Sequence, residues 1–413
     1  MKDRPVIDAL YEALLNGDDE QIQAIQQHRA LECLDLRFLA CTDDPGAVDL
    51  NLGLGIQSCE YVIPIFEGPR ARLMSRHTAI QQRISGGQSN VLIDYSLCFD
   101  SNFAEKLKCL VLGKNIDPVE QARVIEVLRL KAINPRVQFD VMPFLLENTR
   151  LTRDDPKNLR PLDTLIAFRM LDHLDWKAFR DDPTQLLFDA SVDSLRERLQ
   201  PAEESFLASL KLDVHVLRQE AIALGTQALL LRFASLWKAH ARDRRAVMRD
   251  LVDFSLFELG SFPATELTLI WSGIREKDVA PFFGPLINPS HKIVHASRGM
   301  AWDMTHLRAL QDTTRQSQLG SFFVPYFVSF DARWRDLLRL NPIRLLLIDD
   351  GRHSLNAGRV NDREFQLLLN DVMSDQAKQA FSTEQVEARR LGARQPDRSA
   401  RQALVDREVQ AWA

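Results

Sequence analysis

Two long apolar segments that each end on an aspartate constrain the fold of this chain more than any other feature. The first covers residues 91–100 and ends Leu-Cys-Phe-Asp, and the second covers residues 322–331 and ends Val-Ser-Phe-Asp. Continuous apolar runs of this length are typical of strands that are buried on both faces, and a helical pattern follows each of them. We therefore predict an α/β fold built on a parallel sheet, with Asp100 and Asp331 at strand ends.

The other strands are predicted from shorter patterns. Residues 61–66 are β-branched and aromatic but contain a proline, which favours an edge strand or the entrance to a strand. Residues 344–348 read as a further buried strand. Together with the strand at 322–330 and the helix around 334–340, that segment predicts a parallel βαβ unit.

Helical periodicity covers most of the remaining chain. An amphipathic helix is expected over residues 6–27, and residues 118–248 form a helical block that prolines divide into pieces of ordinary length. Further helices are expected over 264–273 and 300–310. The end of the chain has few large apolar residues, so we expect a frayed helix or a mobile tail there.

These patterns divide the chain into five consecutive parts. The parts are a helical and edge-strand segment packed on the core (1–84), the first part of the core (85–117), a helical insertion (118–260), the second part of the core (261–373) and a polar C-terminal tail (374–413).

Composition excludes several classes of protein. A hydrophobic fraction of 45% and a charged fraction of 26% are ordinary for a globular chain, and a net charge of -5 argues against indiscriminate coating of nucleic acid. The five cysteines form no Cys-x-x-Cys pair, which predicts reduced core thiols. Without a signal peptide or a bilayer-length apolar run, a cytoplasmic protein with no membrane association is expected.

Acids at strand ends are the strongest candidates for chemistry. Ligands of open parallel sheets bind beyond the carboxyl ends of the strands, where Asp100 and Asp331 are expected. An aspartate in that place is also a good helix N-cap, so either one alone has a structural explanation. Asp303, on the predicted helix before the second strand, adds a third carboxylate.

Taken in order, these residues resemble the pattern of the PIN-like metal-dependent nucleases. Asp100 with Asn102 matches the Asp and following Asn after the first strand of that family. Asp303 matches its third acid, on a helix, and Ser329 with Asp331 matches the Thr/Ser-x-Asp that follows a later strand.

Two positions of the resemblance have competitors. For the second acid, Glu147 lies at a sequence distance from Asp100 that suits the family, and Glu258 is the alternative. For the first acid, Asp94 competes with Asp100. The two would stand roughly 20 Å apart along an unbroken strand, so only one of them can take part.

The resemblance implies a PIN-like core, flanked by helices and interrupted by a large helical insertion that contributes a core helix near Glu147. It implies hydrolysis of nucleic acid, more often RNA than DNA, by an endoribonuclease. The four acids would bind Mg²⁺ or Mn²⁺ for the activation of water, and Asn102 and Ser329 would orient them by hydrogen bonds.

The alternative function is that of a non-catalytic helical interaction or regulatory protein, in which the acids are helix caps and the insertion binds a partner. A protein partner such as an antitoxin or a regulator is compatible with the nuclease too. The sequence leaves open the oligomeric state and the choice between a toxin, a defence effector and a processing enzyme.

Overall fold

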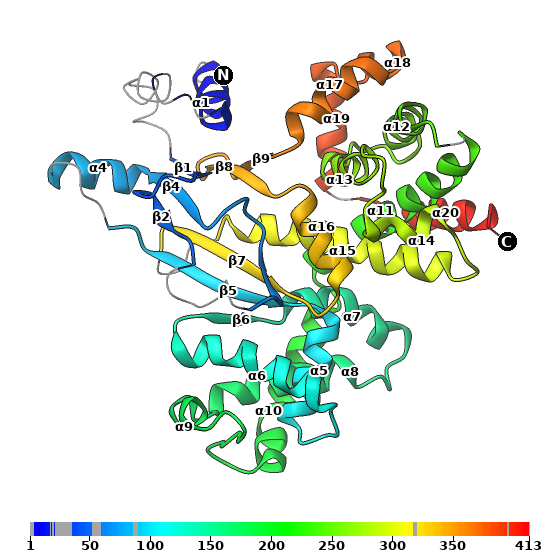
Figure 1. Cartoon of the computed structure of the whole chain (residues 1–413). Coiled ribbons are helices and arrows are strands. Elements are labelled where there is room, and N and C mark those ends of the chain that lie inside the picture. The colour runs from blue at the N-terminus through cyan, green and yellow to red at the C-terminus, as the bar shows by residue number, and fades with distance from the viewer. Residues whose placement is uncertain are drawn as a thin grey trace.

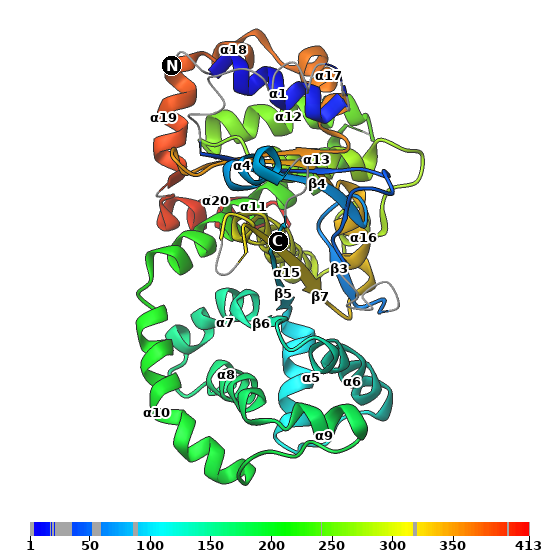
Figure 2. The same cartoon turned by 90° about the vertical axis from the view of Figure 1, so that its left-hand side faces the viewer.

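The chain forms a mixed α/β fold in which two open sheets are surrounded by helices (Figures 1 and 2). This computed structural model describes residues 4–16, 18, 20, 35–51, 59–85, 90–240, 242–316, 320–394 and 396–412. In that part of the chain no helix is both long and apolar enough to cross a membrane.

The first sheet has four strands in the order β3 (Val62–Pro64), β7 (Phe322–Val328), β5 (Ile93–Phe99) and β6 (Gln138–Asp140). β5 pairs in parallel with both β6 and β7, and β3 pairs antiparallel with β7 at the edge. The two long apolar segments are therefore confirmed as central strands, and residues 61–66 as an edge strand. The three-residue β6 lies inside the segment that we expected to be entirely helical.

The second sheet has five strands in the order β2 (Val48–Asp49), β4 (Arg70–Ser75), β1 (Leu36–Cys41), β8 (Ile343–Asp349) and β9 (Ser354–Arg359). Every neighbouring pair in this sheet is antiparallel. The N-terminal segment thus contributes three strands that the sequence reading missed.

The predicted parallel βαβ unit around residues 322–348 is wrong. β7 and β8 are joined by α16 (Ala332–Leu340), but they belong to different sheets. β8 instead pairs antiparallel with β1 and β9, and Ile343 forms an isolated parallel bridge with Phe66 at the junction of the two sheets. Apolar content identified β8 as a buried strand, but it carries no information on which neighbour the strand pairs with.

Helices of the middle part of the chain cover one side of the sheets in Figure 2. They are α5 (Ser101–Val111), α6 (Pro118–Ile133), α7 (Met142–Asp154), α8 (Arg160–Met170), α9 (Trp176–Asp181) and α10 (Val192–Leu210), with a short 3-10 turn, Leu171–His173, after α8. They confirm the helical block predicted over 118–248.

A second group of helices surrounds α11 (Val214–Ala239), which is buried on nearly all sides and packs against α15 and α20. The group consists of α12 (Arg244–Asp253), a π-helical turn (Phe254–Glu258), α13 (Ala264–Ile274), a 3-10 turn (Pro281–Phe283), α14 (Gly284–Ile287), α15 (Ile293–Thr313), α17 (Asp362–Val372), α18 (Asp375–Gln379), α19 (Thr383–Arg394) and α20 (Arg398–Gln410). The segment after residue 374, expected as a frayed helix or mobile tail, therefore contains three helices.

Two hydrophobic cores hold these layers together. The main core includes the aromatic rings of Phe99, Phe327 and Trp334, which are almost fully buried between the four-stranded sheet and its helices. A smaller core lies between α1 (Arg4–Asn16) and the five-stranded sheet, where Leu10 packs with strand residues. The helix predicted over 6–27 begins as expected, and most of its second half lies outside the described residues. The described residues of the N-terminal segment also form α4 (Arg76–Ser85).

Candidate active site

Two strands of the four-stranded sheet end side by side and bring the predicted acids to one edge. Phe99 stands opposite Val328 in the parallel pair of β5 and β7, and the backbone N–H of Asp100 donates to the Val328 carbonyl at 3.1 Å. Asp100, Ser329 and Asp331 therefore emerge together at the carboxyl ends of these strands, beside the starts of α5 and α16 (Figure 1).

Asp100 is buried and caps α5. Its carboxylate accepts the backbone N–H of Phe103 at 2.7 Å and the hydroxyl of Ser329 at 2.5 Å. Burial raises the pKa of Asp100 from 3.8 to about 7, although these two hydrogen bonds act in the opposite direction. The charges of Glu147 and Asp331 add to the increase, which places both of these acids near Asp100.

The Ser329 hydroxyl links two of the acids. It donates to Asp100 and accepts the backbone N–H of Asp331 at 3.0 Å, and its side chain has no exposed surface. Asp331 caps α16 by accepting the N–H of Arg333 at 2.9 Å, and the Arg333 guanidinium stands 3.7 Å from the carboxylate. The expected orienting role of Ser329 is therefore supported by its contacts.

Asp303 approaches the same place from the middle of α15, where no helix end needs a cap. Its pKa is raised well above the ordinary value, first by burial and then by the charges of Glu147, Asp331 and Asp100, while Arg333 acts against the increase. These charge interactions place the four predicted acids in one region of the fold.

Glu147 completes the acid cluster, by which we mean Asp100, Glu147, Asp303 and Asp331. On α7, its carboxylate accepts the hydroxyl of Ser101 at 2.5 Å, and Asn148 in turn donates to Ser101 at 2.8 Å. Burial alone would raise the pKa of Glu147, but His306 and the Ser101 hydrogen bond outweigh it and lower the pKa. Glu147 therefore carries a negative charge more readily than Asp100 and Asp303, whose pKa values are raised.

His306 is a buried neighbour of the acid cluster that the sequence reading did not assign to it. Its Nε2 stands 3.7 Å from the Glu147 carboxylate, which is too long for a hydrogen bond but close enough for a charge contact. The imidazole lies between the rings of Trp302 and Phe327, at centroid distances of 5.7 and 6.1 Å. Neither ring nitrogen has a hydrogen-bond partner in the described part of the chain. The sequence does contain a signal for this assignment, because a residue three positions after Asp303 lies on the same side of a helix.

The competing candidates lie elsewhere. Asp94 stands at the start of β5, at the opposite end from Asp100, and accepts the backbone N–H of Gly320 at 2.8 Å. Glu258 ends the π-helical turn and forms an ion pair with Arg407 at 2.5 Å. Neither belongs to the acid cluster.

The predicted orienting role of Asn102 has no support in the contacts. Its side chain is exposed on the first turn of α5. The residue that hydrogen-bonds an acid there is its neighbour Ser101, which the pattern Asp-Ser-Asn also contains and which sequence reasoning passed over.

The donor set of the acid cluster is that of a hard divalent cation. Carboxylate oxygens are preferred by Mg²⁺ and Mn²⁺, and Mg²⁺ commonly keeps several waters and binds through only one or two carboxylates. Across the described residues, no three His, Cys, Asp or Glu side chains stand close enough together to hold a metal ion directly. The residues therefore fit a hydrated cation by their chemistry, with few direct ligands.

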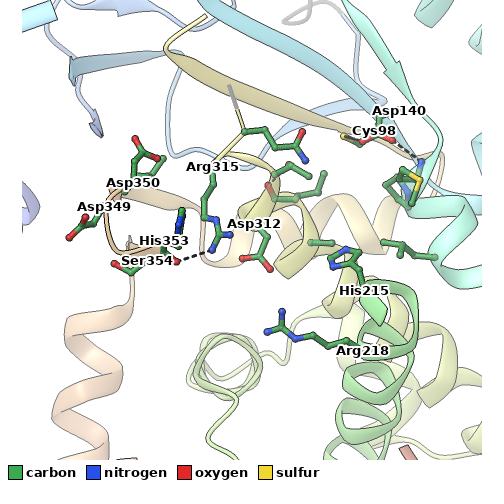
Figure 3. Close-up of a pocket in the computed structure, with 18 residues that line it drawn as sticks. Cys98, Asp140, His215, Arg218, Asp312, Arg315, Asp349, Asp350, His353 and Ser354 are labelled. Carbon is green, nitrogen blue, oxygen red and sulfur yellow. Dashed lines mark hydrogen bonds between the residues drawn. The ribbon is translucent and has the colours of Figure 1, made fainter. Parts of the chain in front are cut away.

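A cavity of about 550 Å³ lies beside the acid cluster, between the starts of α7 and α11, the end of α15 and the turn after β8. In Figure 3, Arg218 of α11 points toward Asp312 and Arg315 at the end of α15. Leu146, the neighbour of Glu147, lines this cavity, but the four acids are not among its described lining residues. It is therefore a separate space behind the acid cluster.

No protein-family model, no curated protein and no solved structure matches this chain. Its function is therefore argued from its own residues.

Replacing Ser329 by Ala should loosen the acid cluster. The change removes the hydroxyl between Asp100 and Asp331 and leaves buried groups unpaired, so we expect the free energy of unfolding to fall by about 1–3 kcal/mol. Since the hydroxyl lowers the pKa of Asp100, that pKa should rise further in the variant. Urea unfolding and carboxyl titration by NMR would measure both effects, and Ser329→Thr, which keeps the hydroxyl, should restore the pKa. An unchanged pKa in Ser329→Ala would contradict the assigned role.

Proposed function

We propose that this chain is a metal-dependent phosphodiesterase whose active site is the acid cluster. The observation that carries the proposal is that β5 and β7 end side by side on Asp100 and Asp331. Glu147 and Asp303 lie near enough for their charges to act on the same site. Within that class, we propose a PIN-like endoribonuclease that acts on RNA in preference to DNA. The parallel order of β7, β5 and β6, with acids at the carboxyl ends, supports a PIN-like core.

Helix capping, the competing explanation, accounts for only half of the acid cluster. Asp100 and Asp331 do cap α5 and α16, as a non-catalytic protein would require. Asp303 caps no helix and lies among three other acids whose charges oppose its ionisation. Such an arrangement lowers stability unless a cation offsets it, and this cost favours a functional role.

Each side chain has a separate part in the proposed mechanism. Asp100, Glu147, Asp303 and Asp331 would hold Mg²⁺ or Mn²⁺, which supplies an activated water and stabilises the leaving oxygen when bound. Ionised Glu147 provides the first negative charge, held in place by Ser101. Asp100 must lose its proton before it can act as a ligand, and Ser329 keeps its carboxylate directed by donating to it. Arg333 places a positive charge beside Asp331.

Cleavage by a matched pair of aspartate variants tests the proposal. Asp331→Asn keeps the N-cap but removes the charge, so we expect cleavage to fall at least about 100-fold. Asp243→Asn is the control, because Asp243 caps α12 in the same way and lies outside the acid cluster. Purified proteins would be incubated with a panel of RNA and DNA strands in Mn²⁺ or Mg²⁺.

We expect RNA to be cut by the wild type and by Asp243→Asn, and cleavage to stop in EDTA. Equal cleavage by wild type and Asp331→Asn would reject the acid cluster as the active site. Cleavage that persists in EDTA would reject the metal requirement.

A further inference from the structure

A second cavity, of about 230 Å³, shares no described lining residue with the space in Figure 3. It is enclosed by α7, α11, α15 and α20, which lie around one another in Figure 2. Arginines from three of these helices line it, namely Arg150, Arg298 and Arg398. We call it the arginine pocket.

The arginine pocket adjoins the acid cluster along two helices. Arg150 follows Glu147 by one turn of α7, and its Nε donates to the Glu147 carbonyl at 3.2 Å. Arg298 precedes Asp303 by five residues on α15, which is about 7.5 Å of helix rise. Trp302, next to Asp303, forms part of the wall. Arg150 and Arg298 thus stand about one turn and one and a half turns of helix from two of the acids, which allows one nucleic-acid strand to contact both places.

Positive charge exceeds negative charge in the arginine pocket. Of its two carboxylates, Glu220 is already held by Arg153 at 2.5 Å and by Arg398 at 3.2 Å, and Asp154 is exposed. Neither Arg150 nor Arg298 forms an ion pair with a carboxylate of the described residues. Burial and then the charge of Arg298 lower the pKa of Arg150, so the two guanidinium groups repel each other. The charges of Glu147, Asp154 and Glu220 act against this decrease without an ion-pair contact to Arg150.

We infer that the arginine pocket binds a phosphate group of the nucleic-acid strand that the acid cluster cleaves, next to the scissile phosphate. This inference rests on the proposed function, because the arginine pocket would hold the same RNA strand that the acid cluster cleaves. Paired guanidinium groups match phosphate oxygens with two parallel hydrogen bonds each, which makes arginine well suited to such a site. The indole of Trp302 is only 4% exposed, so the pocket offers charge and no open ring face for a base.

Binding measured without cleavage tests the inference. A single-stranded RNA labelled at its 3′ end, with or without a 5′-phosphate, would be titrated in EDTA and followed by fluorescence anisotropy at several KCl concentrations. The two pocket variants are Arg298→Gln and Arg150→Gln. The side chain of Arg298 is exposed, so Arg363→Gln on α17 serves as the control for the loss of one exposed charge. Circular dichroism confirms that each variant is folded.

We expect each pocket variant to bind RNA about tenfold more weakly at low salt, since each loses a charge-assisted contact. The slope of log K against log salt should fall by about 0.7, the value for one phosphate contact on a single strand. A loss seen only with 5′-phosphorylated RNA would assign the pocket to a strand end, and an equal loss with both RNAs to an internal phosphate.

Wild-type affinity and slope in both pocket variants would overturn the inference, as would an equal loss in Arg363→Gln. Asp331→Asn separates the two proposals, because its cleavage in Mn²⁺ should fall at least about 100-fold while its binding in EDTA stays at the wild-type level. If Asp331→Asn cleaves normally while Arg298→Gln binds poorly, the proposed active site fails and the phosphate pocket stands.

Discussion

Replacing Asp303 by Asn should abolish cleavage and at the same time stabilise the metal-free protein. Asp303 is surrounded by Glu147, Asp331 and Asp100, whose charges raise its pKa well above the ordinary value. A neutral amide removes that repulsion and needs no proton. At pH 8 in EDTA we therefore expect the free energy of unfolding to rise, by about 0.5–2 kcal/mol as for other stabilising substitutions. Cleavage in Mn²⁺ should fall at least about 100-fold.

Urea unfolding and a cleavage assay on the same preparations would measure the two effects of Asp303→Asn. The control is again Asp243→Asn, which should leave both quantities near their wild-type values, because Asp243 is a cap outside the acid cluster. Opposite signs for stability and activity are the mark of a site that is organised for a ligand. If Asp303→Asn instead destabilised the protein and cleaved RNA normally, Asp303 would be an ordinary structural residue.

The stability of the metal-free protein should fall as pH rises from about 4 to about 7, and a divalent cation should reverse the loss. The pKa of Asp100 rises from 3.8 to about 7 on folding, so the folded state binds its proton more tightly than the unfolded state does. Such a group stabilises the fold at low pH, and its contribution is lost as pH rises through the folded-state pKa. For Asp100 alone the change is on the order of 4 kcal/mol.

Unfolding by urea at pH 5 and pH 8, with EDTA or Mn²⁺, would measure this dependence. The lowered pKa of Glu147 acts in the opposite direction, but only near and below its ordinary range. Asp140 and Asp362, whose pKa values burial also raises, add to the loss caused by Asp100 and Asp303. Comparison with Asp100→Asn isolates the part that is due to Asp100. Saturation with Mn²⁺ at 100 times its Kd should restore about 2.7 kcal/mol at pH 8. Asp100→Asn should flatten the pH dependence. A wild type equally stable at both pH values, with no response to Mn²⁺, would refute the assignment.

Strand positions were predictable because they depend on local composition, whereas strand partners were not. β7 consists of apolar and aromatic residues, and β5 adds only Asp94 and Ser96 to such a sequence, which is what burial on both faces favours. The pairing of β8 depends on β1, some three hundred residues earlier, and nothing local to β8 reveals it.

The C-terminal helices were missed for a related reason. α20 buries only Val405 and Glu408 against its neighbours and carries many charged residues. Its position against α11 depends on ion pairs such as that of Arg398 with Glu220, and single-residue patterns do not predict such pairs.

Within the candidate site, the acids could be found from the sequence but their supporting contacts could not. Asp100 and Asp331 follow apolar strands, which made them visible. Ser101 and His306 act on Glu147 from two other helices, so their roles exist only once α5, α7 and α15 have packed. Packing also explains why Ser101 and not Asn102 contacts an acid. The direction of each side chain on the first turn of α5 decides which of the two meets Glu147.

The hydrogen bond from the Ser329 hydroxyl to Asp100 also determines when the site can form during synthesis. These two residues are 229 positions apart in the chain, and Asp303 and Asp331 also lie beyond the middle helices. A growing chain on the ribosome therefore carries Asp100 and Glu147 through the synthesis of the whole middle part of the chain without the residues that complete the acid cluster. Any activity of these acids toward RNA would be withheld until Asp331 has been added and has folded onto β5, although the nascent chain spends that time beside ribosomal and messenger RNA.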